Sequence, residues 1–182
     1  NGHYDVELSS NGHQQSQNLA DAFSRLPVKA VYSSDLTRTR VCADLIAEAH
    51  SLTPTVCPEL RELSFGKWEG MSVKELAEKH PGVLEKRFHH PDTFKADGGE
   101  SFQELHDRTL PRFLEIAKAH LGQTIVVVAH GGVNRTILAK LLEFPLSNLF
   151  RISQDYAAVN RIQFHPDMPL VDFVNGTPEQ IT

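Results

Sequence analysis

The sequence has few cysteines, no long hydrophobic run and no signal peptide. Two cysteines in 182 residues are too few for a disulfide scaffold, and Cys42 and Cys57 do not form a C-x-x-C pair. We therefore expect a reducing compartment and predict a cytoplasmic protein. No apolar run approaches the roughly 20 residues that cross a bilayer, and no leader with a basic start and an apolar centre opens the chain. We expect no membrane partner.

Basic residues are not in excess either. Lysine and arginine number 18 against 23 aspartates and glutamates, which gives a net charge of −5 and a pI near 6.0. A surface that binds nucleic acid is normally basic, so we expect no nucleic-acid partner, although a local cationic pocket is compatible with this balance. The 40% of hydrophobic residues can form a proper core, and we predict one domain over residues 1–182.

Motifs of several common enzyme classes are missing. The sequence contains neither the G-x-x-x-x-G-K-[ST] nor the G-x-G-x-x-G motif of nucleotide-binding folds, and it lacks the G-x-S-x-G elbow of serine hydrolases. The ten histidines are scattered, and no His/Cys spacing matches a zinc site. We therefore expect no metal and no cofactor, and keep a metal-binding protein as a minor alternative.

One apolar run ends in a histidine and two glycines, residue types that are common in binding and catalytic sites. Thr124 to Ala129 is apolar and mostly β-branched, and His130-Gly131-Gly132 follows directly. Such a run predicts a strand buried on both faces, as in a parallel sheet covered by helices. Helical spacing resumes at Val133, and free N–H groups at a helix start favour an anion. Because ligands bind at the carboxyl ends of strands in such sheets, His130 is a candidate site residue; the alternative, a histidine that merely ends a strand, is about as common.

Strands and helices alternate along most of the chain, which predicts an α/β fold with a largely parallel sheet. Strands are predicted at residues 28–32, 55–57, 124–129, 159–164 and 170–174. Helices are predicted from Ser9 to about Leu26, after a cap by Ser34 or Asp35, from Ser72 to about His80, from Val83 to Phe88, after Ser101, from Val133 to about Leu142, and as a short turn from Leu146 to Ile152. The helices that follow Ser72 and Ser101 are each predicted to begin with a capping box, in which Glu75 and Glu104 are the acidic partners. The helix after Ser101 is expected to be kinked or divided at Pro111, and its inward residues are predicted to be Leu105, Leu110, Phe113, Leu114, Ala117 and Leu121. A small helical insert is predicted at about residues 71–97.

Two charged residues are candidates for a site at the strand ends. Arg38 falls in the first turn of a predicted helix, where a cation opposes the helix dipole; alone it would be a solvated arginine, but beside an anion site it becomes a phosphate ligand. Glu62 lies between Leu60 and Leu63, so it can be partly buried. Partial burial favours the protonated form of a carboxyl group, which can then donate a proton. An ordinary surface glutamate is the alternative.

Three separated segments resemble one family, the histidine phosphatase superfamily that includes the cofactor-dependent phosphoglycerate mutases. The segment from Ser33 to Arg38 is similar to the family's S-S-x-L-x-R motif. The segment from Leu60 to Gly70 is similar to L-x-E followed by G-x-W-E-G, and the apolar strand into His130-Gly131-Gly132 is the third match. Gly99-Glu100-Ser101 and the opening segment from Gly2 to Leu8 match as well. The order and spacing of these motifs make the resemblance specific, and it covers nearly the whole chain.

The resemblance implies a three-layer sandwich of the phosphoglycerate mutase type and a metal-independent phosphoryl transfer. In this family a histidine attacks the phosphoryl group and forms a phosphohistidine, which water or a second alcohol then resolves. By the resemblance, Arg38, His130 and the Gly131 N–H would bind the phosphoryl oxygens. Glu62 would protonate the leaving oxygen and later help to deprotonate the attacking water.

One part of the family pattern is absent. The family's nucleophile lies in an R-H-G motif at the end of the first strand, and no R-H-G occurs in this sequence. His130 matches the family's second histidine, since Ala129 precedes it. We therefore expect the first strand and the nucleophile to lie upstream of Asn1 in a longer protein, and the 182 residues alone to be inactive. Gly2 and His3 would belong to a loop that contacts the substrate.

The resemblance leaves the exact reaction open. The predicted insert is shorter than in most mutases of the family, and F-G-x-W-E-G is more similar to the small phosphatase branch, which includes α-ribazole phosphatases. Gln154-Asp155-Tyr156 through Asn160 is weakly similar to that group. We expect a phosphomonoesterase for a small phosphorylated metabolite. The alternatives are mutase-type transfer to a second alcohol and an inactive member that still binds phosphate through Arg38 and His130. A homodimer is also compatible with the family.

Overall fold

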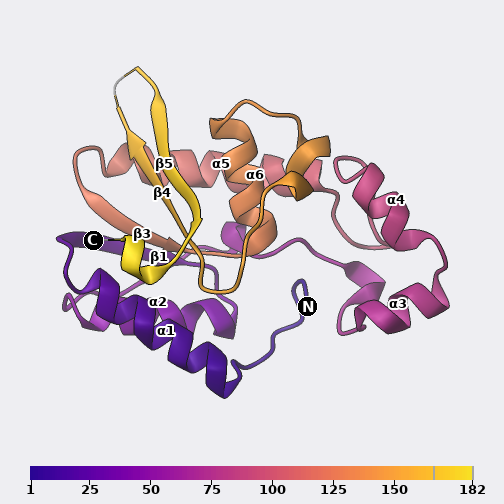
Figure 1. The fold of residues 1–182 in the computed structure, drawn as a ribbon, viewed down its shortest axis with the longest axis horizontal. Coiled ribbons are helices and arrows are strands. Elements are labelled where there is room, and N and C mark those ends of the chain that lie inside the picture. Colours follow the sequence, from indigo (N-terminus) through magenta and orange to yellow (C-terminus); the bar gives the residue numbers. More distant parts are fainter. Residues whose placement is uncertain (166, 182) are drawn as a thin grey trace.

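A small sheet lies between two layers of helices, with α1 and α2 on one face and α5 and α6 on the other (Figure 1). The computed structural model describes residues 1–165 and 167–181, so Pro166 and Thr182, the last residue of the predicted domain, lie outside it. The helices are α1 (Ser10–Phe23), α2 (Thr37–Glu48), α3 (Val73–Lys79), α4 (Val83–His89), α5 (Phe102–Ala119) and α6 (Gly131–Leu141). Short 3₁₀ turns are η1 (Pro58–Leu60), η2 (Gly66–Trp68), η3 (Leu146–Arg151) and η4 (Pro178–Gln180). The α/β class predicted from the sequence is confirmed.

Three parallel strands form the central sheet. β1 (Val28–Ser33) lies between β2 (Thr55–Val56) and β3 (Thr124–Val128), and both of its pairings are parallel. Ser33 at the end of β1 is opposite Val56 on one side and Val128 on the other. The three carboxyl ends therefore meet at one edge of the sheet, where ligands bind in open α/β folds.

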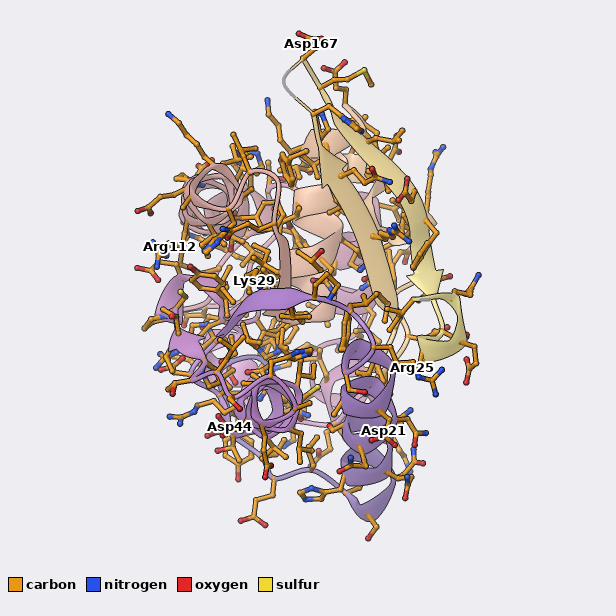
Figure 2. All side chains as sticks on the ribbon, turned by 90° about the vertical axis from the view of Figure 1, so that its left-hand side faces the viewer. Asp21, Arg25, Lys29, Asp44, Arg112 and Asp167 are labelled. Atoms are coloured by element: carbon orange, nitrogen blue, oxygen red, sulfur yellow. The ribbon has the colours of Figure 1, made fainter. Side chains whose placement is uncertain are left out.

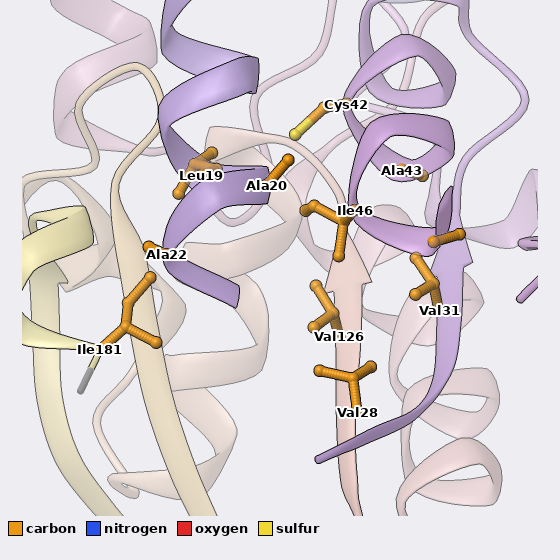
Figure 3. Close-up of a cluster of buried hydrophobic side chains, with 11 residues drawn as sticks. Leu19, Ala20, Ala22, Val28, Val31, Cys42, Ala43, Ile46, Val126 and Ile181 are labelled. Carbon is orange, nitrogen blue, oxygen red and sulfur yellow. The ribbon is translucent and has the colours of Figure 1, made fainter. Parts of the chain in front are cut away.

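Side-chain alternation along β3 divides the hydrophobic core between the two faces. Val126 packs with Val31 and Ile46 in the cluster beneath α1 and α2, shown in Figure 3. Ile125 and Val127 contact the cluster that α5 and α6 build on the other face. Burial of a side chain such as Ile46, which is 1% exposed, contributes roughly 1.5–3 kcal/mol. The sheet is thus held from both sides.

β3 is less buried than its sequence predicts. Of its residues only Val126 is fully buried, because β3 pairs with β1 on one edge and has no strand on its other edge within the described part of the chain. β4 (Val159–Phe164) and β5 (Pro169–Gly176) pair with each other as a separate antiparallel ribbon. Ile162 and Phe164 of β4 contact the same core as β3, yet β3 and β4 are not hydrogen-bonded.

The start of α2 is capped from a distance. The prediction that Ser34 or Asp35 caps this helix is wrong, because both side chains bind elsewhere in the fold. Instead, the Asp5 carboxylate accepts hydrogen bonds from the Thr37 N–H at 2.9 Å and from the Thr37 hydroxyl at 2.8 Å. This contact ties the N-terminal segment to the helix that carries Arg38. The capping boxes predicted at the starts of α3 and α5 are present.

α5 is one continuous amphipathic helix. It runs through Pro111, which lies on the exposed side, so the predicted division there is wrong. Leu114 and Leu121, both predicted to point inward, are 37% and 59% exposed. Leu114 lies beside the buried stripe, whose members include the adjacent Phe113. Leu121 follows the helix end at Ala119, where helical spacing no longer applies.

The predicted insert contains the short helices α3 and α4, which lie at one end of the molecule (Figure 1). The loop after α4 leads back to the sheet layers at Ser101, the N-cap of α5. Within the described ranges, no helix is both long enough and apolar enough to span a membrane.

Candidate active site

Segments that are far apart in the sequence meet at the carboxyl edge of the sheet. Ser34 follows β1, His130 follows β3, and Glu62 lies in the loop after η1. Arg38 is in the first turn of α2. Arg38 is close enough to Glu62 and to His130 for their charges to interact. The structure thus brings together the three residues that the resemblance assigns to the chemistry.

His130 is buried and held by a hydroxyl group. Its side chain is 8% exposed, and its Nε2 lies 2.8 Å from Ser34 Oγ, which lies 2.7 Å from Thr39 Oγ1. Burial, with smaller contributions from the positive charges of Arg38 and His3, lowers the pKa of His130 to about 3. The imidazole is therefore neutral at neutral pH, and it can donate one hydrogen bond without adding a further charge to a cationic site.

Arg38 is partly buried and hydrogen-bonds to no carboxylate among the described residues. Its guanidinium donates to the backbone carbonyls of Gly2, at 2.6 Å, and Tyr4, at 3.2 Å. Burial lowers the pKa of Arg38, while the charges of Glu62 and Asp5 oppose this shift. A phosphoryl oxygen carries a negative charge that a backbone carbonyl lacks, and arginine binds such groups through two parallel hydrogen bonds. An anion at this position would therefore compete well with the two carbonyls.

Glu62 bridges the loop after η1 and the start of α6. Its Oε1 accepts from the Leu63 N–H at 2.8 Å, and its Oε2 accepts from the Gly132 N–H at 3.0 Å. A Cβ atom at Gly132 would lie 2.2 Å from Oε1 of Glu62. Glycine is therefore required for this close approach, and any side chain at position 132 would displace the carboxylate.

Arg108 of α5, which the sequence does not single out, fixes the backbone around Glu62. Its Nη1 donates to the Glu59 carbonyl at 2.7 Å and its Nη2 to the Glu62 carbonyl at 3.3 Å. Glu100 accepts from Arg108 Nε at 2.9 Å and from the Ser64 N–H at 3.0 Å. Burial raises the pKa of Glu100, but these hydrogen bonds outweigh it and the pKa is lowered. The one signal in the sequence was the motif match around Glu100.

The N-terminal segment lies against the same loop. Gly2 has a left-handed backbone with φ of +49°, and a Cβ atom there would lie 2.3 Å from Glu69 Oε1. The Glu69 carboxylate accepts from the His3 N–H at 2.9 Å and from the Phe65 N–H at 2.8 Å. The His3 Nε2 lies 2.8 Å from the Glu62 carbonyl oxygen. Gly2 and His3 are therefore beside Glu62 and Arg38, at the position expected of a substrate loop.

Two further arginines lie near Glu62, and the sequence reasoning missed both. Burial lowers the pKa values of Arg87 in α4 and Arg135 in α6, and the charge of Glu62 opposes the shift in each case. Arg135 donates to the Ile152 carbonyl at 2.9 Å. In the sequence, an arginine in a short polar helix or in the middle of an amphipathic one is indistinguishable from a surface cation. Only the folded arrangement places these two beside a carboxylate.

Side chains, and not a large hollow, define this candidate site. A hollow of about 430 Å³ lies beside α3 and α4 and is lined by Trp68, His80 and other residues, none of which is Arg38, Glu62 or His130. Among residues 1–165 and 167–181, no group of three or more histidine, cysteine, aspartate or glutamate side chains is arranged to hold a metal ion.

The fold and the site define an α/β protein whose sheet edge gathers three arginines, a buried histidine and one central glutamate. The sequence model of the histidine phosphatase superfamily (branch 1) matches residues 1–177. The chain belongs to the histidine phosphatase superfamily.

Two curated relatives are phosphoserine phosphatases. The chain is 34% identical over 161 residues to Phosphoserine phosphatase 1 of Hydrogenobacter thermophilus, an alignment that covers 88% of this chain and 76% of that protein. It is 36% identical over 147 residues to the Metal-independent phosphoserine phosphatase of Arabidopsis thaliana, covering 78% of this chain and 61% of that protein. The chain thus spans less than two thirds of the second relative.

Solved structures confirm the fold. A mycobacterial glucosyl-3-phosphoglycerate phosphatase in complex with VO3 superposes with a TM-score of 0.88 at 26% identity, covering 97% of this chain and 90% of that one. The α-ribazole phosphatase of Shigella flexneri gives a TM-score of 0.85 at 23% identity, covering 96% and 87%. At that identity the second likeness supports the fold alone.

The buried, neutral His130 predicts a specific pH dependence of stability. Because its folded-state pKa is about 3 and its unfolded value is about 6.5, the unfolded chain binds an extra proton between these two values. The free energy of unfolding should therefore fall as the pH drops below about 6.5, by at most about 1.4 kcal/mol per pH unit from this group. His130→Gln removes the group, so its unfolding free energy should fall less between about pH 6.5 and pH 5 in urea titrations. The same slope in both proteins would contradict a neutral, buried His130.

Proposed function

We propose that this chain forms most of the active site of a phosphomonoesterase that acts through a phosphohistidine on a small phosphorylated metabolite. The observation that carries the proposal is the convergence of Arg38, His130 and Glu62 at the start of α6. These residues come from separate elements, and their positions match the family's motifs one by one. The names of the relatives support the reaction class, since two of the most similar are phosphoserine phosphatases.

The phosphoryl group would bind where Arg38 now contacts two carbonyls. Arg38 would exchange them for phosphoryl oxygens, which are stronger, charged partners. His130 would donate its N–H, and the Gly131 N–H at the start of α6 would add a backbone donor with the favourable end of the helix dipole. These donors are held in place before the reaction begins, which is the arrangement that stabilises a phosphoryl-transfer transition state best.

Glu62 would act as the proton carrier. In the first step the nucleophilic nitrogen forms a bond to phosphorus, the ester P–O bond breaks, and Glu62 gives its proton to the leaving oxygen. In the second step water attacks phosphorus, the P–N bond breaks, and Glu62 takes a proton from the water. The hydrogen bond to the Gly132 N–H holds the carboxylate at the mouth of the anion site.

The nucleophile would come from a strand upstream of Asn1. Such a strand is expected from the family's R-H-G motif, which this sequence does not contain. The unpaired edge of β3 supports it, because β3 and β4 contact one core without bonding to each other within the described residues. A strand at that edge would pair with β3 and would end close to Gly2, at the carboxyl edge of the sheet.

Hydrolysis is favoured over transfer to a second alcohol. The identities alone do not separate the two reactions: a relative named Phosphoglycerate mutase-like protein 4 is 37% identical over 140 residues, and the first phosphoserine phosphatase is 34% identical over 161. The short insert at about residues 71–97 of the one proposed domain supports hydrolysis. A member that binds phosphate without turning it over would be the outcome if no R-H-G segment belongs to the protein.

We also infer a cytoplasmic location and a homodimer. The location is supported by Cys42 and Cys57, which are both buried and unpaired. The homodimer is supported by β2, whose outer edge has no partner strand in the described part of the chain and whose Val56 is 39% exposed.

Replacing Arg38 tests the anion site directly. Arg38→Ala removes a charge-assisted contact worth about 1.5–3 kcal/mol, so inorganic phosphate should bind roughly ten- to a hundred-fold more weakly in calorimetry. Arg40→Ala is the matched control, because Arg40 is an exposed arginine of the same helix. Equal phosphate affinity in wild type and Arg38→Ala would exclude Arg38 as a phosphate ligand.

Replacing Glu62 tests the proton carrier. In the protein that includes the R-H-G segment, Glu62→Gln should slow hydrolysis of alkyl phosphates by about 10²–10⁴-fold, the usual contribution of a general acid. Hydrolysis of p-nitrophenyl phosphate should slow much less, because p-nitrophenolate leaves without a proton. If steady-state rates fall by the same factor for both substrates, Glu62 has a structural role instead.

A further inference from the structure

Arg87 is a charged side chain that the proposed reaction does not use. It lies in α4, within the insert, and it makes no hydrogen bond or ion pair inside the described ranges. Burial lowers the pKa of Arg87, and Arg135 adds to this effect. Arg87 is partly buried, and a partly buried cation without a hydrogen-bond partner has a desolvation cost, which an anion from outside these residues would offset.

Three phenyl rings hold the Arg87 guanidinium. Its Cζ lies 4.7 Å from the ring centroid of Phe65, 5.5 Å from that of Phe150 and 5.9 Å from that of Phe102. Phe102 and Phe150 also contact each other at 5.6 Å, edge to face. Such rings orient a guanidinium through its faces and leave the N–H groups at its edges free. The cage fixes the position of the charge without neutralising it.

The cage places this charge beside the candidate active site. Phe65 carries an N–H that donates to Glu69, which also holds His3. Among the described residues, two charged groups act on Arg87: the carboxylate of Glu62 raises its pKa, and the cation Arg135 lowers it. Arg135 lies one turn into α6, and its Nη1 reaches back to donate to the carbonyl of Gly131, the first residue of that helix, at 3.2 Å.

The charges around Glu62 do not balance. Its single negative charge acts on three cations, Arg38, Arg87 and Arg135. Arg38 is also influenced by Asp5 and Glu69, and Arg135 by Asp155. Arg87 has no such second acidic neighbour. A phosphoryl group held by Arg38 and His130 would leave Arg87 without a counter-charge.

We propose that Arg87, with Arg135 beside it, binds a carboxylate on the leaving-group side of the substrate, so that the substrates are phosphomonoesters of hydroxy acids. A single unpaired guanidinium with free edges matches a planar monoanion, which it binds through two parallel hydrogen bonds. A second phosphoryl dianion would need more free charge than Arg87 supplies, because Arg135 is already bonded to the Ile152 and Gly131 carbonyls and is influenced by Asp155. Arg87 would determine which phosphomonoesters bind, and the insert that carries it would supply substrate specificity to the reaction that Arg38, Glu62 and His130 perform. The inference rests on the phosphomonoesterase proposed above.

Two stable phosphonates that differ by one carboxylate test this proposal without turnover. 2-Amino-4-phosphonobutyrate carries the carboxylate and 3-aminopropylphosphonate lacks it. In calorimetry with the full-length protein, the first should bind at least about ten-fold more tightly than the second. Arg87→Met should remove this preference, and Arg87→Lys should keep part of it, since the charge remains but the paired donors do not. Arg25→Met is the charge-matched control and should keep the preference, because Arg25 is exposed and lies just beyond the end of α1 (Figure 2).

The outcomes separate this inference from the proposed function. If inorganic phosphate binds to the wild type but the two phosphonates bind equally, the carboxylate subsite is wrong and the phosphomonoesterase stands. If inorganic phosphate does not bind at all, the proposed function itself fails. If Arg87→Met weakens both phosphonates and phosphate by one common factor, Arg87 supports the fold through its aromatic cage and selects no ligand. Circular dichroism of each variant confirms that it is folded.

Discussion

The hydrogen bond from the Gly132 N–H to the Glu62 carboxylate, at 3.0 Å, joins the two halves of the site. One half is η1 with the loop after it, whose Glu59 and Glu62 carbonyls accept hydrogen bonds from Arg108. The other half is the turn from β3 into α6, which carries His130. The contact is possible because position 132 has no side chain. The position of Glu62 relative to Arg38 and His130 therefore depends on a glycine and on an arginine in a third element.

The side chains of the site hold their positions without a ligand, and bringing several arginines together costs electrostatic energy. Arginines from three helices surround one glutamate, and the buried His130 is kept neutral. Salt bridges neutralise the arginines that support the structure, as Glu100 does for Arg108. Those that face the site, Arg38 and Arg87, hydrogen-bond to no carboxylate within the described residues. Cations that support the fold are thus paired with carboxylates, whereas Arg38 and Arg87 keep their charge available for the anionic substrate proposed above.

Sequence reasoning predicts the parts of this protein that depend on local pattern. The buried run into His130 and the capping boxes could be located because periodicity, β-branching and spacing carry those signals, and the motifs pointed to Arg38 and Glu62. Three features depend on contacts between distant segments and carry no local signal. These are the cap that Asp5 provides for α2, the clamp by Arg108 and the aromatic cage of Arg87. The overestimated burial of β3 has the same origin, because burial depends on which strand pairs with its second edge.

The central claim is that phosphoryl transfer on this scaffold passes through a histidine that precedes Asn1. The most direct test is rapid mixing of the full-length protein with a ³²P-labelled phosphomonoester, followed by quenching in base and peptide mapping. The account predicts a transient label that survives base, is lost in acid, and maps to the histidine of an R-H-G sequence. A label on His130 or on a serine, or turnover by the 182-residue chain without any labelled histidine, would contradict it.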